Sequence, residues 1–464
     1  MTIKEEVVNK LKSIVGDDWV VTTREMIERY LYDETPEAFR PKPSVDVVVV
    51  KPRTTEEVSK IVKLANEEKI PVFPRGGGTG LVGGAIPTKP GIILSLERMD
   101  SIKIDKENLV AEVEAGVTLA KLLEEADKAG LFFPPHPGDE GATVGGMIAT
   151  NAGGARAVRT GVMRNYVLGM EVVLPNGDIV VLGGKVIKNN TGYNLMHLII
   201  GSEGTLGIIT EAYIRLYPKY RASATMVIPF KDRLNAVKAA HEVLKSGVIP
   251  LLLEYVEKDV IERSASYLGL KWPVEEGFAH LIVTVSESSE DLVYTELELI
   301  NDVITKYTDL EPVVATRDDE QREILKIRSE VYTSLKKDLI DILDMSLPIG
   351  KIYDFMEEVD KLERKYNTWI PIIGHIGDGN LHAHIMKTEG WTKELYERLE
   401  DELYEITVRL GGVISGEHGV GATRMRYFMK YTDRKYLELL RMFKKVLDPN
   451  NILNPGKVIP ETLK

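Results

Sequence analysis

Half of the eight histidines lie in one stretch of the chain, between positions 375 and 418. In the segment IPIIGHIGDGNLHAHI, the dipeptide Asp378-Gly379 has the sequence of a two-residue hairpin turn between apolar strand residues. This turn predicts that His375 faces His382 across the hairpin, with Cβ atoms about 4.5–5.5 Å apart. Alternation along the strand places His384 on the same face as His382. Three imidazoles on one face form a platform for a divalent metal such as zinc, iron, nickel or copper.

A second polar segment, ISGEHGVG, contains a carboxylate and an imidazole side by side. Gly416 and Gly419 flank Glu417 and His418, which form a short polar tip between apolar stretches. We expect Glu417 to add a carboxylate ligand to the histidine platform, and a mixed set of this kind also suits manganese. His418 then lies next to the metal, where a neutral imidazole can accept a proton as a general base.

The densest glycine cluster, PRGGGTGLVGGAIPTKPG, follows a predicted strand. Its Gly78-x-Gly80-x-x-Gly83 spacing matches the dinucleotide fingerprint, but Pro87 and Pro90 exclude the helix that a nicotinamide site needs directly after the loop. The loop also lacks the Gly-Lys-Ser/Thr ending of a Walker motif. What remains is a nest in which successive backbone N–H groups converge on a phosphate, or else a tight surface loop without a ligand.

The elements around these motifs divide the chain into parts. Residues 1–40 have apolar positions at helical spacing, and 45–50 form a β-branched strand. Two further helices begin at Thr54, where Glu57 completes a capping box, and at Thr118. Beyond about 220 the pattern of strands and helices predicts an antiparallel sheet with helices on one face. We therefore expect an α+β protein with domains at 1–220 and 221–425 and a C-terminal helix and tail at 426–464.

Composition limits the possible functions. The chain contains no cysteine, which excludes disulfides, thiolate catalysis and iron–sulfur ligands from this sequence. A formal net charge of -12 argues against nucleic acid as a partner. We found no apolar run of signal-peptide or membrane-spanning length, so the expected location is cytoplasmic, with peripheral attachment to the inner face of the membrane left open.

Three segments together resemble the FAD-binding domain of the vanillyl-alcohol oxidase and p-cresol methylhydroxylase type: PRGGGTGLVGG, PGDEGATVGGMIATNAGG and GSEGTLGIIT. The histidine motifs and the closing NPGK resemble one branch of it, the D-lactate, glycolate and D-2-hydroxyglutarate dehydrogenases. The resemblance covers essentially the whole chain. It implies a two-subdomain flavin domain, a substrate (cap) domain that carries a metal site, and a C-terminal segment that returns to the flavin domain.

The resemblance also implies which residues hold FAD. The pyrophosphate-binding loop and the positions that line the flavin and the adenosine are Pro74, Arg75, Gly76, Gly77, Gly78, Thr79, Gly80, Gly83, Pro137, Gly138, Thr143, Gly145, Gly146, Ala149, Asn151, Gly153, Gly154, Glu203, Gly207, Ile209 and Asn454, with Lys457 in the tail. Some members of the superfamily link FAD covalently through a histidine in this region. We expect non-covalent FAD here and interpret His136 as a loop histidine near the isoalloxazine.

For the second site the resemblance implies that His375, His382 and Glu417 bind a divalent metal (Zn, Mn or Fe) and that His418 is the catalytic base. It further implies that Arg328 binds the substrate carboxylate. His384 departs from the asparagine of the D-2-hydroxyglutarate dehydrogenases and is expected to contact substrate or metal. These relatives also carry a lysine for a second carboxylate, where this chain has Ile342.

The expected reaction is the oxidation of a small D-2-hydroxy acid, D-lactate first and glycolate next, by hydride transfer to FAD. A D-2-hydroxyglutarate dehydrogenase, another oxidase or synthase on the same scaffold, and a flavin-bearing electron-transfer subunit are the alternatives. The electrons must leave to an external acceptor such as a quinone, a dye or a partner electron-transfer protein. Both a homodimer and a subunit of a membrane-associated complex are compatible with the sequence.

Overall fold

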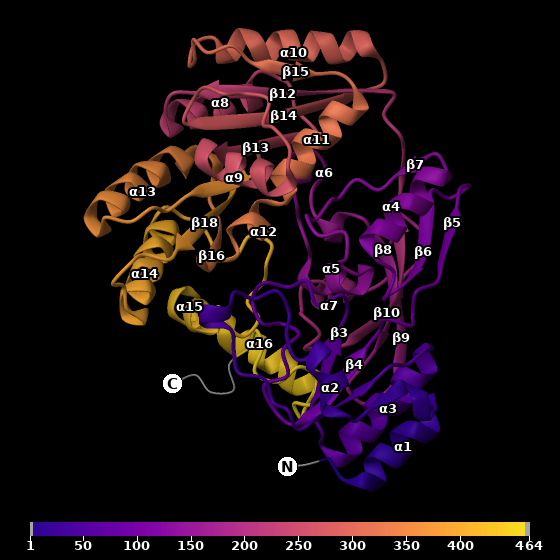
Figure 1. Ribbon diagram of the computed structural model, residues 1–464. Helices are drawn as coiled ribbons and strands as arrows, with labels where there is room; N and C mark the ends of the chain where they lie inside the picture. The colour runs from indigo at the N-terminus through magenta and orange to yellow at the C-terminus, as the bar shows by residue number, and fades with distance from the viewer. Residues whose placement is uncertain (1–2, 460–464) are drawn as a thin grey trace. The chain divides into compact units, whose positions relative to one another are not determined.

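The computed structural model describes residues 3–459 and divides the chain into two compact units. Unit 1 consists of residues 1–152, 162–218 and 418–464, and unit 2 consists of residues 153–161 and 219–417. The chain thus enters unit 2 twice, first as a short excursion and then as one long segment. Figure 1 labels the elements of both units. Both helices and sheets are abundant, so the α+β prediction is confirmed.

Unit 1 contains two main sheets. The first has the order β1-β2-β4-β3, with the last three strands parallel, and its strands are β1 (Val20–Val21), β2 (Val47–Val50), β4 (Gly91–Ser95) and β3 (Val72–Arg75). The second is antiparallel in the order β5-β6-β10-β8-β9, with β5 (Ile102–Asp105), β6 (Val110–Glu114), β10 (Ile208–Arg215), β8 (Val167–Val173) and β9 (Ile179–Gly183). A short pair joins β7 (Leu131–Phe132) to β11 (Tyr217–Pro218).

The helices of unit 1 begin and end at residues that suit those positions. The principal helices are α1 (Glu5–Val15), α3 (Thr55–Glu68), α4 (Leu119–Lys128), α5 (Val144–Thr150), α15 (Met425–Tyr431) and α16 (Arg434–Leu447), with short α2 (Arg24–Ile27) and α7 (Met196–Ile199). The Thr54 and Thr118 hydroxyls accept the predicted capping bonds, from the N–H of Glu57 and of Lys121. The Glu57 carboxylate accepts from Arg53 N–H rather than closing the predicted box on Thr54. The first helix of the region predicted as helical ends at Val15, because Gly16 follows with φ of 93°, and only short helical segments such as α2 follow before residue 40.

Unit 2 is built on one antiparallel sheet of seven strands in the order β15-β12-β14-β13-β17-β18-β16. The strands are β15 (Val313–Ala315), β12 (Ala222–Phe230), β14 (Ala279–Glu287), β13 (Leu252–Glu257), β17 (Ile372–His375), β18 (Asn380–Met386) and β16 (Leu339–Ser346). One group of helices packs on this sheet and on each other: α8 (Arg233–Lys245), α10 (Glu290–Ile304), α13 (Ile352–Tyr366) and α14 (Lys393–Arg409).

A second group of helices adds to the arrangement expected from the sequence. It consists of α9 (Lys258–Leu268), α11 (Asp318–Ser329) and α12 (Val331–Leu335), and the short α6 (Ala157–Thr160) also contacts β13. These helices share an apolar cluster with Leu252 and Val256 of β13, Ile373 of β17 and Met386 of β18. Because side chains alternate along a strand, Glu254, His375, His382 and His384 extend from this same face of the sheet.

Candidate active site

The histidine hairpin consists of β17 and β18, with the predicted turn between them. The predicted pairing of His375 with His382 is wrong: His375 pairs with Asn380, and His382 pairs with Ile373. The turn is four residues long rather than two, because Asp378 Oδ1 accepts the N–H of Asn380 at 3.0 Å and starts the turn one position earlier. A shift of two residues leaves every side chain on its original face. His375 and His382 therefore still lie together, with ring centroids 5.5 Å apart.

Glu417 completes a three-residue cluster in unit 2, in which His375 is buried and His382 and Glu417 are partly buried. Its Oε1 atom lies 3.1 Å from His375 Nε2 and 3.4 Å from His382 Nε2. Ligand atoms bound to one zinc ion at about 2.0–2.2 Å lie roughly 3–3.6 Å apart. The three residues thus offer two nitrogens and one carboxylate oxygen at the separations that a single metal ion requires, within the part of the chain that the structure describes.

The Glu254 carboxylate contacts His375 at Nδ1, the ring nitrogen that does not face Glu417. The fully buried Glu254 carboxylate has Oε1 2.6 Å from His375 Nδ1 and Oε2 2.7 Å from Arg328 NH2. A histidine that donates from Nδ1 to a carboxylate keeps the lone pair of Nε2 for a metal. One carboxylate therefore positions both a histidine expected to bind metal and the arginine expected to bind substrate.

Charge within the cluster is arranged for cation binding. Burial opposes the charged form of His375, but Glu254 and Glu417 together raise the pKa of this imidazole well above its usual value. Burial likewise opposes ionisation of Glu417, and His375 and His382 outweigh it and lower the pKa of this carboxyl. Burial and the neighbouring His382 lower the pKa of His384 to about 3, so this ring is neutral at physiological pH.

Asp344 is a buried member of the site that the sequence analysis did not assign. Its Oδ2 atom accepts the backbone N–H of Glu417 at 2.9 Å and the hydroxyl of Ser415 at 2.8 Å. Its Oδ1 atom accepts from the Asn380 amide at 2.7 Å and lies 3.5 Å from His382 Nε2. Asp344 thus fastens the Glu417 segment to the histidine hairpin and adds a second carboxylate beside His382.

Two polar groups of unit 2 have hydrogen-bonding capacity left for a ligand. Arg328 Nε and His384 Nδ1 are buried and have no hydrogen-bond partner among the residues that the structure describes. Ile342 lies opposite His384 in the pairing of β16 with β18 and is 4 % exposed. The position to which the resemblance assigns a lysine for a second carboxylate is therefore apolar and buried in this chain.

In unit 1 the predicted FAD-binding residues converge from four segments. The glycine loop reaches α5 at Gly76, where an added Cβ would lie 2.2 Å from the Thr143 hydroxyl. The turn at 203 reaches α5 through the Glu203 N–H, which donates to Ala149 at 2.8 Å. The Asn454 amide closes the ring, because it donates to the carbonyls of Gly84 and Glu203 at 3.1 and 2.8 Å. Gly153 and Gly154 lie in the short excursion that belongs to unit 2.

The glycine loop is shaped for an anion. It runs to β4 without a helix, as Pro87 and Pro90 predict. Within the described chain, the backbone N–H groups of residues 77–80 make no hydrogen bond to protein. An added Cβ at Gly77 would lie 2.3 Å from the Gly141 carbonyl, and Gly78 has φ of 73°, so side chains are excluded at both positions. Free donors in a loop that only glycine can form are the fit expected for a pyrophosphate.

Glu203 has a further contact that the sequence did not predict. Its carboxylate accepts the N–H groups of Val420 and Gly421 at 2.7 and 2.9 Å. Burial raises the pKa of Glu203 to about 7. His418 is the first residue of the C-terminal part of unit 1. Through these contacts Glu203 anchors the segment that begins at His418 to its own turn, which lies beside the glycine loop.

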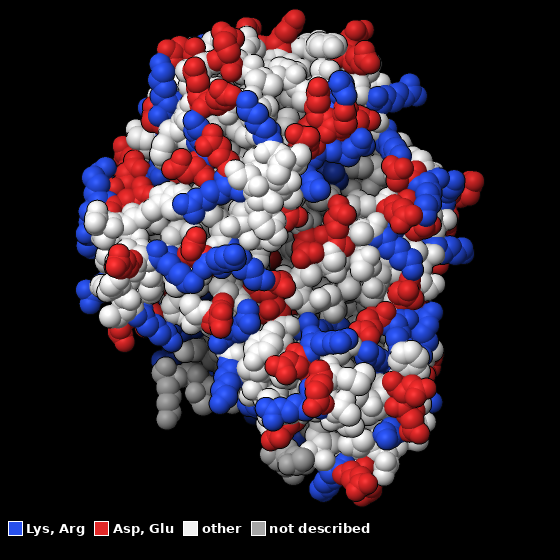
Figure 2. All heavy atoms as spheres, in the orientation of Figure 1, with Lys and Arg blue, Asp and Glu red and all other residues white. Residues whose placement is uncertain are grey.

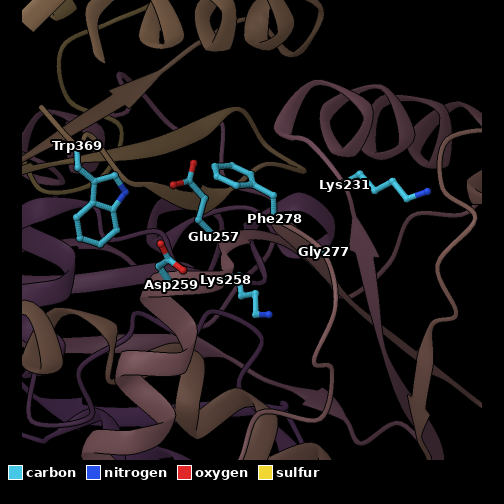
Figure 3. Close-up of a pocket in the computed structure, with 7 residues that line it drawn as sticks. All are labelled: Lys231, Glu257, Lys258, Asp259, Gly277, Phe278 and Trp369. Atoms are coloured by element: carbon cyan, nitrogen blue, oxygen red, sulfur yellow. The ribbon is translucent and has the colours of Figure 1, made fainter. Parts of the chain in front are cut away.

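Two further features do not contribute to the clusters described above: His136 and the hollow whose lining residues Figure 3 draws. His136 Nε2 is 3.5 Å from Glu140 Oε1 in the loop before α5. A hollow of about 370 Å³ lies at the start of α9, and Lys231, Glu257 and Lys258 line it. In Figure 3 the two lysine ammonium groups point away from the Glu257 carboxylate. Glu257 lies 3.0 Å from buried Arg233, and burial raises its pKa to about 7. None of the four clustered histidines lines this hollow, which we interpret as part of a structural ion network.

Comparisons with known proteins agree with this geometry. Residues 47–183 match a family described as FAD binding domain, and residues 219–458 match FAD linked oxidases, C-terminal domain. The chain is 45% identical to a D-lactate dehydrogenase of Archaeoglobus fulgidus, over 93% of this chain and 96% of that protein. It is 34% identical to the glycolate oxidase subunit GlcD of Bacillus subtilis, over 92% and 91% of the two chains.

Among solved structures, p-cresol methylhydroxylase with substrate bound superposes with a TM-score of 0.78 at 21% identity, over 97% of this chain and 96% of that one. An alkyldihydroxyacetonephosphate synthase superposes with a TM-score of 0.75 at 19% identity, over 97% and 84%. At this identity the likeness shows the fold alone, and it agrees with the fold that the sequence analysis expects. The sequence matches extend further, and the chain belongs to the family of FAD-linked oxidases.

Proposed function

We propose that the protein oxidises a small D-2-hydroxy acid, D-lactate in the first place and glycolate next, to the 2-oxo acid. The observation that carries the proposal is the cluster of His375, His382 and Glu417, in which the Glu254 carboxylate contacts both His375 and Arg328. A phenol oxidase has no need of such a cluster. The curated relatives named D-lactate dehydrogenase and glycolate oxidase subunit GlcD support the substrate class.

Each group has a role in this reaction. Arg328 binds the substrate carboxylate through the donors that Glu254 leaves unused, since a guanidinium matches a carboxylate in two places. His418 takes the proton of the C2 hydroxyl as the C2 hydride leaves, so that the alcohol becomes a ketone. A divalent ion (Zn, Mn or Fe) held by His375, His382 and Glu417 supplies a Lewis acid for the hydroxyl group. Non-covalent FAD, held by the ring of segments in unit 1, supplies the hydride acceptor that no side chain can replace.

Substrate size follows from the apolar position opposite His384. Ile342 offers no charge to a second carboxylate, and His384 is neutral. A monocarboxylate therefore suits the site better than D-2-hydroxyglutarate. The reduced flavin must pass its electrons to a quinone, a dye or a partner protein, because a chain without cysteine holds no iron–sulfur cluster of its own. A cytoplasmic location is part of the proposal.

Anaerobic titration of the purified flavoprotein tests the proposal. D-lactate, L-lactate, glycolate and D-2-hydroxyglutarate are added separately while the oxidised flavin band, at about 450 nm, is recorded. We expect D-lactate to bleach the band fastest and L-lactate to leave it unchanged. Bleaching by D-2-hydroxyglutarate alone would favour the dicarboxylate alternative. A yellow protein that none of the four acids bleaches would contradict the proposed reaction and favour a synthase or an electron-transfer subunit.

A further inference from the structure

Among the residues that the structure describes, helix α16 packs on unit 1 through one side. Leu437 and Lys444 are buried. The Lys444 ammonium donates to the carbonyls of Thr205 and Leu453 at 2.7 and 2.8 Å and lies 2.6 Å from the Asp448 carboxylate. These contacts fix the rotation of the helix, and they attach it to the 203–207 turn that contributes to the FAD-binding ring.

The opposite side of α16 is apolar and faces solvent. Five large apolar side chains recur there at helical spacing, and we define them as the apolar stripe: Tyr436, Leu439, Met442, Phe443 and Val446. Their exposed fractions are 50, 46, 64, 38 and 79%, respectively. At about 100° per residue they span roughly 120° of the helix circumference, centred opposite Leu437 and Lys444. Such a stripe on a fully folded helix indicates a surface that docks on something apolar.

The charge around the stripe is reversed from that of the whole chain. Between positions 424 and 445 the sequence has eight basic residues and two acidic ones, whereas the whole chain has a formal net charge of -12. Of these basic residues Arg424 and Lys444 are buried, and Arg434 pairs with Glu438. Arg434, Lys435 and Lys445 are exposed on α16 itself. A hollow of about 500 Å³ opens beside the helix, with Arg441 and Lys445 in its lining. On the face that Figure 2 shows, acidic and basic side chains are interspersed.

We propose that the apolar stripe of α16 docks on the surface of a bilayer that contains anionic lipids, with the helix axis in the membrane plane. An apolar stripe with cations beside it is the pattern of interfacial helices, whose side chains enter the acyl boundary while lysine and arginine meet the head groups. A second copy of the chain fits less well, because pairing through α16 would bring two basic segments together. The described chain has no helix long and apolar enough to span a membrane, so docking is peripheral.

Vesicle sedimentation with the full-length holoprotein tests the proposal. Vesicles of phosphatidylcholine with roughly 30% phosphatidylglycerol are compared with pure phosphatidylcholine at low and high salt. We expect binding to the anionic vesicles only, weakened by salt. The double substitution Met442→Ser with Val446→Ser should lower the partition coefficient at least about tenfold. Lys435→Glu with Lys445→Glu should lower it comparably, while flavin absorbance is unchanged because these residues lie outside the FAD-binding ring.

A matched control uses Val181 on β9, which is 63% exposed, because Val181→Ser removes a comparable apolar side chain elsewhere in unit 1. This variant should bind vesicles like the unaltered protein. Absence of binding to anionic vesicles at low salt would overturn the proposal, as would equal binding by the Met442/Val446 variant. If that variant instead converts a dimer to a monomer in analytical ultracentrifugation, without any vesicle binding by the parent, the stripe is a contact between copies. If the parent pulls down an acidic redox protein but no lipid, the stripe is a protein-docking surface.

Discussion

Substitution of Glu254 by glutamine is the sharpest perturbation of the candidate active site. Glutamine keeps the volume and can accept one hydrogen bond, but it loses the charge that His375 and Arg328 share at 2.6 and 2.7 Å. Loss of the carboxylate behind a metal-ligating histidine typically costs 10–100-fold in metal affinity or activity. This range corresponds to about 1.4–2.7 kcal/mol. We expect the metal affinity to fall because His375 is held less firmly. We expect the KM for the substrate to rise because Arg328 is held less firmly.

The assay measures metal binding and catalysis separately. The dissociation constant for zinc or manganese is obtained by competition with a chelator, and flavin reduction by D-lactate is followed anaerobically by stopped flow. In Glu254→Gln, the dissociation constant for metal should rise and the rate of flavin reduction should fall, each about 10–100-fold. The amount of bound FAD should not change, because the FAD-binding segments belong to unit 1 whereas Glu254 belongs to unit 2.

Glu257→Gln is the matched control. Glu257 is also buried, lies on the same strand and points to the other face, where it pairs with Arg233 rather than with a histidine. This variant should lose stability without losing metal affinity. If Glu254→Gln binds metal and reduces flavin as the unaltered protein does, Glu254 does not position His375 and our reasoning about the site is refuted.

Three further predictions concern the base, the glycine loop and pH. His418→Ala should slow flavin reduction by about 10²–10⁴-fold with FAD still bound, and unchanged single-turnover rates would remove His418 as the base. Gly77→Ala should yield protein without the yellow flavin band, since the new Cβ would meet the Gly141 carbonyl at 2.3 Å; normal FAD content would contradict the nest. Because burial raises the pKa of Glu203 to about 7, the folded protein holds a proton that the unfolded chain has released. The free energy of unfolding should therefore fall as pH rises from about 4.5 to about 7, and Glu203→Gln should flatten this slope in urea titrations.

The hairpin shows which parts of the site the sequence could predict. The period of side-chain alternation is two, so the shared face of His375, His382 and His384 could be predicted although the register was not. Turn length depends on the Asp378 side chain, which competes with the backbone for the Asn380 N–H, and sequence patterns do not resolve that competition.

The supporting carboxylates could not be assigned because their partners are far away in the sequence. Glu254 and His375 are 121 residues apart, and Asp344 and Glu417 are 73 residues apart. A usable signal existed in both cases: Glu254 interrupts the apolar run LLLEYV, and Asp344 lies within the largely apolar segment LIDILDM. A charged residue inside a buried strand needs a compensating partner, so such positions predict polar networks even when the partner cannot be named.

Reversible removal of the metal tests the central claim most directly. The holoprotein is dialysed against a chelator, its flavin absorbance is checked, and single-turnover reduction by D-lactate is measured before and after zinc or manganese is returned. We predict that FAD remains bound, that reduction is lost in the stripped protein, and that the added metal restores it. Full-rate reduction by protein shown to contain no metal would contradict the account of His375, His382 and Glu417 as a catalytic metal site.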